Sequence, residues 1–313
     1  MRGRSGIYAV AAALLTVAVV LAALRVGEEP GALSGWQALV LGIVQGLTEF
    51  LPISSSGHLI LVPWLADWRY LQENDAFNAT FDVGLHIGTL VAVAAYFRRD
   101  VVELFRAWLR SVRRRSVAGP DERLAWLVVL ATAPAAALGA LGENFIVEEL
   151  GEPWQIAINL AVFGVVLWLA DRTAERRDMR ALGYGEAVGI GFAQALSLMP
   201  GVSRSGITIS AARFLGLDRE SAARFSFLLL VPTTLGAVVW KGVSDVILAD
   251  LPPGSLGPFA VGVTAAAASG FVAIDALLGY VRRNDYSVFV LYRLALALVV
   301  AGLILGGVRD ATF

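Results

Sequence analysis

The chain contains no cysteine, so neither a disulfide nor a catalytic thiol is available to it. It has only two histidines, His58 and His86, which leaves two candidates for any imidazole chemistry. Charged residues are also scarce: they make up 16% of the 313 residues, against 57% hydrophobic residues, and the mean hydropathy is +0.69. A soluble domain of this size needs more charge on its surface. The composition therefore predicts an integral membrane protein.

Seven apolar runs are long enough to cross a bilayer as helices. They occupy roughly 7–26, 78–97, 124–142, 155–170, 224–243, 258–281 and 287–307. Two further apolar stretches, 36–68 and 186–216, are broken in the middle by proline, glycine and serine. Their arms are too short to span singly, and loops at membrane depth are tolerated only where protein or a water-filled cavity satisfies the backbone. We therefore predict an all-α, polytopic membrane protein in which both stretches are re-entrant helical hairpins.

The distribution of arginine predicts the topology. Arginines crowd the connections 98–123, 172–180 and 282–283, whereas 143–154 and 244–257 contain acidic residues and no lysine or arginine. By the positive-inside rule the arginine-rich connections are cytoplasmic. Hairpin 36–68 then enters from outside and hairpin 186–216 from inside, each followed by three spans. We predict two inverted-topology repeats, residues 34–170 and 171–313.

Residues 1–33 lie outside this symmetry. Arg2 and Arg4 precede the apolar run 7–26, and Glu28 and Glu29 follow it. We favour an extra transmembrane helix with its N-terminus inside. A cleaved signal peptide is the alternative, because a charged start before an apolar centre also suits one.

The two hairpins repeat each other in sequence. At an offset of 149 positions Gly42 aligns with Gly191, and Ser54-Ser55-Ser56-Gly57 aligns with Ser203-Arg204-Ser205-Gly206. Such a duplicated, broken segment indicates two repeats around one site. The copies differ where chemistry is expected, because Ser55 in the first copy is replaced by Arg204 in the second.

Arg204 stands at the break of an otherwise apolar hairpin, where an ionisable group is costly and by default a functional candidate. Its planar guanidinium matches two phosphate oxygens. A helix that begins near Gly206 would direct its positive end into the loop. The segment predicts a phosphate cradle, and the alternative is an arginine that reaches the interface or pairs with a carboxylate. Further substrate-binding candidates in this cradle are the glycines and hydroxyls Gly201, Ser203, Ser205, Gly206 and Thr208.

Glu49 and Gln45 are four residues apart and therefore share one helical face. Glu49 is either a ligand for a divalent cation that bridges phosphate oxygens, with Gln45 supplying a carbonyl oxygen, or a carboxylate that orients His58. A structural pair with an arginine is the alternative for Glu49.

His58 follows the triple serine at the start of the second arm. An imidazole can take a proton from a hydroxyl or water, or attack phosphorus itself. Because the repeat sets Ser55 against Arg204, we favour Ser55 as the nucleophile and His58 as its base, and attack by His58 or by water stays open. Ser54 and Ser56 line the same turn and are candidates for substrate contact.

Two other polar pairs occur within predicted spans. Asp82 and His86 are one helical turn apart, and the sequence leaves open whether they face a cavity or form a structural pair. Tyr292 and Arg293 are interpreted as an interface anchor.

These residues together resemble the undecaprenyl-diphosphate phosphatase family, also called bacitracin-resistance proteins. Its motif Glu/Gln-x-x-x-Glu-Phe-Leu-Pro-x-Ser-Ser-Ser/Thr-Gly-His is matched from Gln45 to His58, and its motif Pro-Gly-x-Ser-Arg-Ser-Gly-x-Thr from Pro200 to Thr208. The similarity covers about 34–305, and Gln45 stands where many members have glutamate.

The resemblance implies a phosphatase that converts undecaprenyl diphosphate to the monophosphate and inorganic phosphate, and so recycles the lipid carrier for cell-wall synthesis. It also implies a divalent cation (Mg²⁺ or Ca²⁺), a bacterial inner-membrane location and an active site facing the periplasm. The expected partners are the polyprenyl diphosphate lipid and the membrane, without nucleic acid, and a homodimer stays open.

The competing interpretation is a secondary transporter or flippase for an anionic or phosphorylated lipid, since broken helices in inverted repeats are usual in transporters. A transporter needs no base. The catalytic candidates Glu49, Ser55 and His58 beside Arg204 therefore favour an enzyme.

Overall fold

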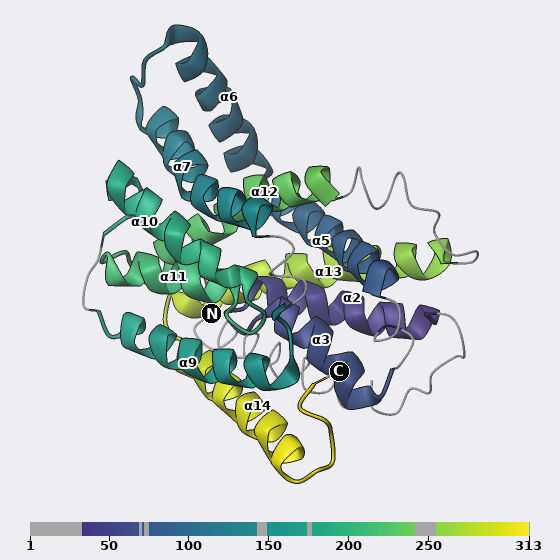
Figure 1. The fold of residues 1–313 in the computed structure, drawn as a ribbon. Coiled ribbons are helices and arrows are strands. Elements are labelled where there is room, and N and C mark those ends of the chain that lie inside the picture. Colours follow the sequence, from purple (N-terminus) through teal and green to yellow (C-terminus); the bar gives the residue numbers. More distant parts are fainter. Residues whose placement is uncertain are drawn as a thin grey trace.

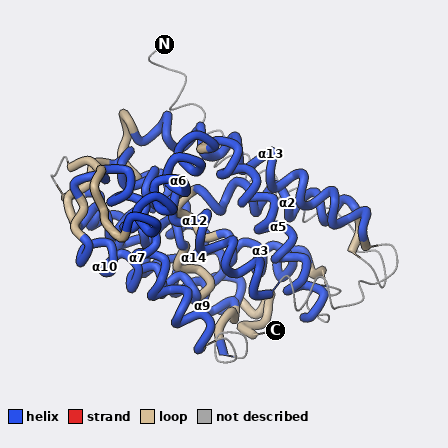
Figure 2. The backbone as a smooth tube through the Cα atoms, turned by 90° about the horizontal axis from the view of Figure 1, so that it is seen from above, coloured by secondary structure: helices blue, strands red, loops and turns tan. Residues whose placement is uncertain are grey.

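The protein is described by a computed structural model that covers residues 33–68, 71, 75–142, 149–173, 177–241 and 255–312. The predicted span 7–26 and much of the acidic connections 143–154 and 244–257 lie outside these residues. Within the described ranges every element larger than an isolated β-bridge is a helix (Figure 2). In chain order they are α2 (Gly35–Phe50), α3 (Ser55–Ala66), α5 (Asp75–Tyr96), α6 (Arg98–Arg114), α7 (Pro120–Leu141), α9 (Pro153–Asp171), η1 (Met179–Ala181), α10 (Tyr184–Ala195), η2 (Leu196–Leu198), α11 (Arg204–Phe214), α12 (Arg219–Lys241), α13 (Leu256–Val281) and α14 (Ser287–Leu305).

Six of these helices, α5, α7, α9, α12, α13 and α14, are long and apolar enough to cross a membrane. They coincide, within a few residues, with the six predicted spans that fall on described residues. Length and composition thus confirm the prediction of an all-α, multi-pass membrane protein.

The arginine-rich stretch after α5 is a helix, α6, where the sequence predicted only a connection. A search for long apolar runs does not detect this helix, because its hydropathy is low. The helix is amphipathic: Ala107 and Ser111 are buried and the arginines are exposed. Asp100 in the first turn and Arg113 and Arg114 in the last turn also match the helix dipole. Helix α6 projects with α7 from the rest of the molecule (Figure 1).

Both broken stretches fold as helix–loop–helix hairpins, as predicted. In the first, α2 and α3 flank a loop in which Leu51 and Ile53 are fully buried. In the second, α10 continues into the short η2, and a loop with buried Val202 leads to α11. Protein surrounds both loops, which is the condition for irregular backbone at membrane depth.

A glycine at the same repeat position lets each hairpin approach a long helix closely. A Cβ atom on Gly42 of α2 would lie 2.3 Å from the carbonyl oxygen of Gly262 in α13. A Cβ atom on Gly191 of α10 would lie 2.7 Å from the carbonyl oxygen of Ala131 in α7. Small residues of this kind allow helix backbones to pack closely in membranes. Each first arm therefore rests on a long helix from the other half of the chain (Figure 1).

Candidate active site

The two hairpin loops have the same unusual backbone conformation at equivalent positions. Ser54 and Ser203 have φ angles of 77° and 75°, in the left-handed region that residues with a Cβ atom seldom adopt. Each serine caps the following helix: Ser54 Oγ accepts from Gly57 N at 3.3 Å, and Ser203 Oγ accepts from Gly206 N at 3.0 Å. The residues after these caps open α3 and α11. They are Ser55 and Arg204, the pair that the sequence repeat aligns.

Hydrogen bonds join the two loops directly. Gly201 N donates to Ser54 Oγ at 3.1 Å, and Ser205 Oγ donates to the carbonyl oxygen of Leu51 at 3.0 Å. Gly201 has a φ of +93°, and a Cβ atom there would lie 2.8 Å from the carbonyl oxygen of Ile156. Glycine is required at this position both for its conformation and for its space. The loops thus form one packed unit.

Arg293 of α14 holds this unit in place. Its side chain is fully buried, and its described partners are all main-chain carbonyl oxygens. These carbonyls come from both loops and from α9, so one guanidinium satisfies backbone acceptors that would otherwise be buried without a donor. The acceptors are Pro52 of the first loop, Gly201 and Val202 of the second, and Asn159 and Leu160 of α9, at 2.8–3.2 Å.

His58 is tied to the same helix. Its Nδ1 lies 2.6 Å from the carbonyl oxygen of Ser54, and its Nε2 lies 2.6 Å from the hydroxyl of Tyr292. A carbonyl oxygen can only accept, so Nδ1 donates and Nε2 of the neutral ring accepts from the tyrosine. Both ring nitrogens are therefore in use, and the side chain is buried. The structure brings His58 to Tyr292, and no described hydrogen bond links it to Ser55.

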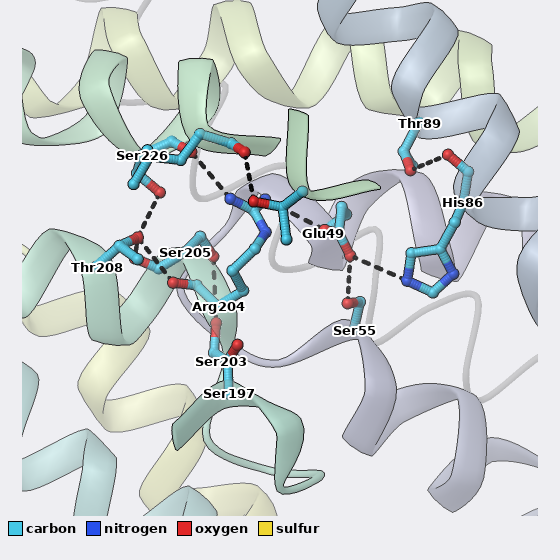
Figure 3. A network of polar contacts seen from close by, with 12 residues as sticks. Glu49, Ser55, His86, Thr89, Ser197, Ser203, Arg204, Ser205, Thr208 and Ser226 are labelled. Carbon is cyan, nitrogen blue, oxygen red and sulfur yellow. Dashed lines mark hydrogen bonds and ion pairs between the residues drawn. The ribbon is translucent and has the colours of Figure 1, made fainter. Parts of the chain in front are cut away.

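Glu49, near the end of α2, is the centre of a polar network (Figure 3). Its Oε2 accepts from Ser55 Oγ at 2.5 Å and from Gln45 Nε2 at 3.2 Å. Its Oε1 accepts from Arg204 Nη2 at 3.2 Å. His86 Nε2 lies 3.9 Å from Oε2. A single buried carboxylate on α2 thus contacts a hydroxyl, a guanidinium and an imidazole from three other helices, α3, α11 and α5.

A cavity of about 390 Å³ lies beside this network. Its volume falls in the usual range for small-molecule sites. Polar and apolar residues both line it, which suits a ligand with a charged head and an apolar tail. The polar lining is Glu49, Ser55, Ser56, Asp82, His86, Ser197, Arg204, Thr233 and Thr234, and the apolar lining is Ala79, Val83, Ala237 and Val238.

Comparison with known proteins identifies the family. Residues 38–299 match the bacitracin resistance protein BacA family. An undecaprenyl-diphosphatase from Rubrobacter xylanophilus is 45% identical over 271 residues, which cover 86% of this chain and 98% of the relative. An undecaprenyl-diphosphatase from Pelotomaculum thermopropionicum is 43% identical over 280 residues, 89% of this chain and 99% of the relative. The chain belongs to the bacitracin resistance protein BacA family. The resemblance seen in the two hairpin motifs is thereby confirmed.

Four of the residues singled out in the family motifs line the cavity: Glu49, Ser55, Ser56 and Arg204. The other predicted substrate contacts have partners within the protein. Ser54 and Ser203 cap helices, Ser205 donates to Leu51, and Gly201 and Gly206 donate their amides to the capping serines. Thr208 Oγ1 lies 2.8 Å from the carbonyl oxygen of Arg204 and 2.7 Å from Ser226 Oγ. In this geometry these motif residues shape the hairpin break that presents Ser55 and Arg204.

Two functional candidates were missed or undervalued by the sequence argument. For Asp82 and His86 the sequence left open a position facing a cavity or a structural pair, and both residues line the cavity beside Glu49. Arg293 was interpreted as an interface anchor, yet it is buried against both loops. The available signal was the same for both residues, namely an ionisable side chain within an apolar span.

The residues that could hold a divalent cation are Glu49 and Gln45. Across the described part of the chain no cluster of three or more His, Cys, Asp or Glu side chains could hold a metal ion. Gln45 Oε1, however, is buried without a hydrogen-bond partner, while its Nε2 contacts Glu49. A carboxylate and an unpaired amide oxygen are hard ligands that suit Mg²⁺ when phosphate oxygens and water complete the shell. The two donors suit Mg²⁺ in kind, and of the two residues Glu49 is the one that lines the cavity.

A larger cavity of about 720 Å³ lies elsewhere, at the ends of α9, α12 and α13. Arg219 Nε donates to Asp171 at 2.6 Å, and Arg282 Nη2 donates to Glu220 at 2.7 Å, so much of the charge in its lining is paired internally. None of the residues in the two family motifs lines it. The smaller cavity beside Glu49 is therefore the candidate active site.

Proposed function

We propose that this protein is an undecaprenyl-diphosphatase that removes the terminal phosphate of undecaprenyl diphosphate in the cavity beside Glu49. The observation that carries this proposal is the contact of Ser55 and Arg204 with the two oxygens of one buried carboxylate at the cavity wall. Relatives that cover most of this chain at 43–46% identity are undecaprenyl-diphosphatases, which supports hydrolysis over transport. The lining of the cavity suits the charged head of such a lipid, while its chain stays in hydrocarbon.

Ser55 is the proposed nucleophile, and Glu49 is its base. The hydroxyl already donates to Glu49 Oε2 at 2.5 Å, so the carboxylate can take the proton as Oγ attacks phosphorus. This assignment replaces His58, the base favoured from the sequence, because both nitrogens of His58 are engaged by Ser54 and Tyr292. In our proposal His58 positions the start of α3, the helix that carries Ser55.

Arg204 is the proposed clamp for the transferred phosphoryl group. Its Nη1 donates to the carbonyl oxygen of Ser226 at 2.9 Å and its Nη2 to Glu49 at 3.2 Å, which fixes the plane of the guanidinium. Its Nε is buried and has no hydrogen-bond partner in the described structure. Nη1 and Nη2 each carry a second N–H beyond these two bonds, so the pre-oriented cation is suited to stabilise charge that develops on a phosphoryl oxygen.

The first step transfers the terminal phosphoryl group from the lipid to Ser55. Ser55 Oγ bonds to the terminal phosphorus, the bond from that phosphorus to the bridging oxygen breaks, and undecaprenyl monophosphate leaves with the electron pair. The hydroxyl proton passes to Glu49. Glu49 and Gln45 would be the protein ligands of a divalent cation, which would neutralise part of the charge of the substrate.

We place the cavity on the periplasmic side of the bacterial inner membrane. The arginine count supports this side, because it makes hairpin 36–68 enter from outside. The structure is consistent with that topology: Asp67, at the end of α3, pairs with Arg309 beyond α14 at 2.9 Å, whereas Arg177 of the arginine-rich connection pairs with Glu186 at the start of α10 at 2.9 Å. The bases of the two hairpins thus lie beside different connections.

The test is phosphate release from undecaprenyl diphosphate by the purified protein in detergent. A transporter releases none. We expect Ser55→Ala to lower turnover by at least about 10³-fold, as loss of a nucleophile does in other enzymes. Ser210→Ala is the matched control, because among the described residues its hydroxyl bonds to the carbonyl oxygen of Gly206 within its own helix α11. Turnover by Ser55→Ala equal to that of the Ser210→Ala control would exclude Ser55 as the nucleophile.

A further inference from the structure

We propose that His86 is the second proton-transfer group of this site, and that it takes the proton of the water that hydrolyses phosphorylated Ser55. The inference rests on the proposed function and adds a residue that lies outside both family motifs. It concerns the second half of the reaction, for which the groups already assigned supply no base.

The position and tautomer of His86 suit this role. Its Nδ1 lies 2.7 Å from the carbonyl oxygen of Asp82, one turn earlier in α5. Because a carbonyl oxygen only accepts, the proton of the neutral ring is on Nδ1 and the lone pair is on Nε2. Nε2 lies 3.9 Å from Glu49 Oε2, the oxygen that accepts from Ser55 (Figure 3). The unprotonated nitrogen therefore faces the carboxylate that accepts from Ser55.

The two histidines of the chain differ in their access to the cavity. His58 is 2% exposed, and both of its nitrogens have partners. The side chain of His86 is 34% exposed and lines the cavity. The charged or titratable side chains that line the cavity with it are Glu49 from α2, Arg204 from α11 and Asp82 from its own helix. Of the two imidazoles, His86 is the one that water and substrate can reach.

The chemistry of the second step requires such a base. After the first step Glu49 holds the proton of Ser55 and cannot accept another, and Arg204 carries no lone pair. Water then attacks the phosphorus of phosphoserine 55 and gives its proton to His86 Nε2. The bond from phosphorus to Ser55 Oγ breaks, and Oγ recovers its proton from Glu49. Inorganic phosphate leaves, and His86 releases its proton to water, so that every group returns to its starting state.

The experiment is rapid-quench kinetics of His86→Gln with undecaprenyl diphosphate, and His58→Gln is the matched control. Loss of a general base costs about 10²–10⁴-fold. We expect His86→Gln to release one equivalent of undecaprenyl monophosphate quickly, then inorganic phosphate about 10²-fold or more slowly, with a phosphoserine trapped at residue 55. In His58→Gln we expect both products to be released at equal rates without a trapped phosphoserine, because both nitrogens of His58 are engaged by Ser54 and Tyr292.

A second variant keeps the inference testable if glutamine disturbs the fold. His86→Ala leaves space for free imidazole, and we expect added imidazole to restore phosphate release in His86→Ala and not in Ser55→Ala. Wild-type rates for His86→Gln, or an equal slowing of both product releases without a phosphoserine, would overturn the role of His86 and leave the phosphatase intact. Full turnover by Ser55→Ala would instead overturn the nucleophile on which the inference rests.

Discussion

Replacement of Arg293 by lysine tests whether one buried guanidinium holds both hairpin loops in their working positions. The five N–H groups of the arginine serve five carbonyl oxygens, those of Pro52, Asn159, Leu160, Gly201 and Val202. Lysine keeps the charge but has only three N–H groups, so at least two of these carbonyls lose their donor.

The number of carbonyls that lose their donor gives the expected decrease in the free energy of unfolding. An unsatisfied buried acceptor costs about 1–3 kcal/mol, which gives about 2–6 kcal/mol for two. Side-chain hydrogen bonds between helices of a membrane protein stabilise it by about 0.6 kcal/mol each on average. Loss of two such bonds gives a lower bound of about 1 kcal/mol for the decrease in stability. The loops present Ser55 and Arg204, and a displacement of about 1 Å at a reacting group can cost about 10²-fold in rate.

We therefore expect Arg293→Lys to lower the unfolding temperature in detergent and to reduce kcat by about 10²-fold, with a smaller change in KM. Tyr292→Phe is the control from the neighbouring residue. It removes a single hydrogen bond, to His58, and should cost about 1 kcal/mol and only a few-fold in rate. The reasoning is refuted if Arg293→Lys matches the wild type in both unfolding temperature and kcat.

Three further predictions concern the site. Arg204→Lys should reduce turnover by about 10²–10³-fold in a folded protein, because lysine lacks the fork that donates at several points. Near-normal turnover would make the arginine structural. Glu49→Gln should reduce turnover and raise the concentration of divalent cation needed, and full wild-type activity in excess chelator would exclude a role for the cation. A cysteine in place of Ser56, in this cysteine-free chain, should react with an aqueous thiol reagent added from the periplasmic side. Reaction only from the cytoplasmic side would reverse the proposed orientation.

The sequence alone determined the features that depend on local composition. Hydropathy located the six described spans, because a helix that crosses a membrane needs a continuous apolar run. Proline, glycine and serine located both hairpin breaks, since these residues interrupt helices wherever they cluster. The 149-residue offset paired Ser55 with Arg204, and the structure gives both residues the same place after a strained serine cap. The helix α6 was not predicted, because an amphipathic helix rich in arginine has low hydropathy and does not form a continuous apolar run.

Only the tertiary structure decided which side chains meet. Ser55 and His58 are three positions apart in sequence, yet α3 directs His58 toward Tyr292, 234 positions away. Glu49 instead reaches Ser55, and α5 brings His86 to the same carboxylate. Spacing along one helix shows which residues share a face, whereas the partner of that face depends on how distant helices pack. For that reason the motifs indicated the candidate site, and only the fold showed that Ser55 contacts Glu49 and not His58.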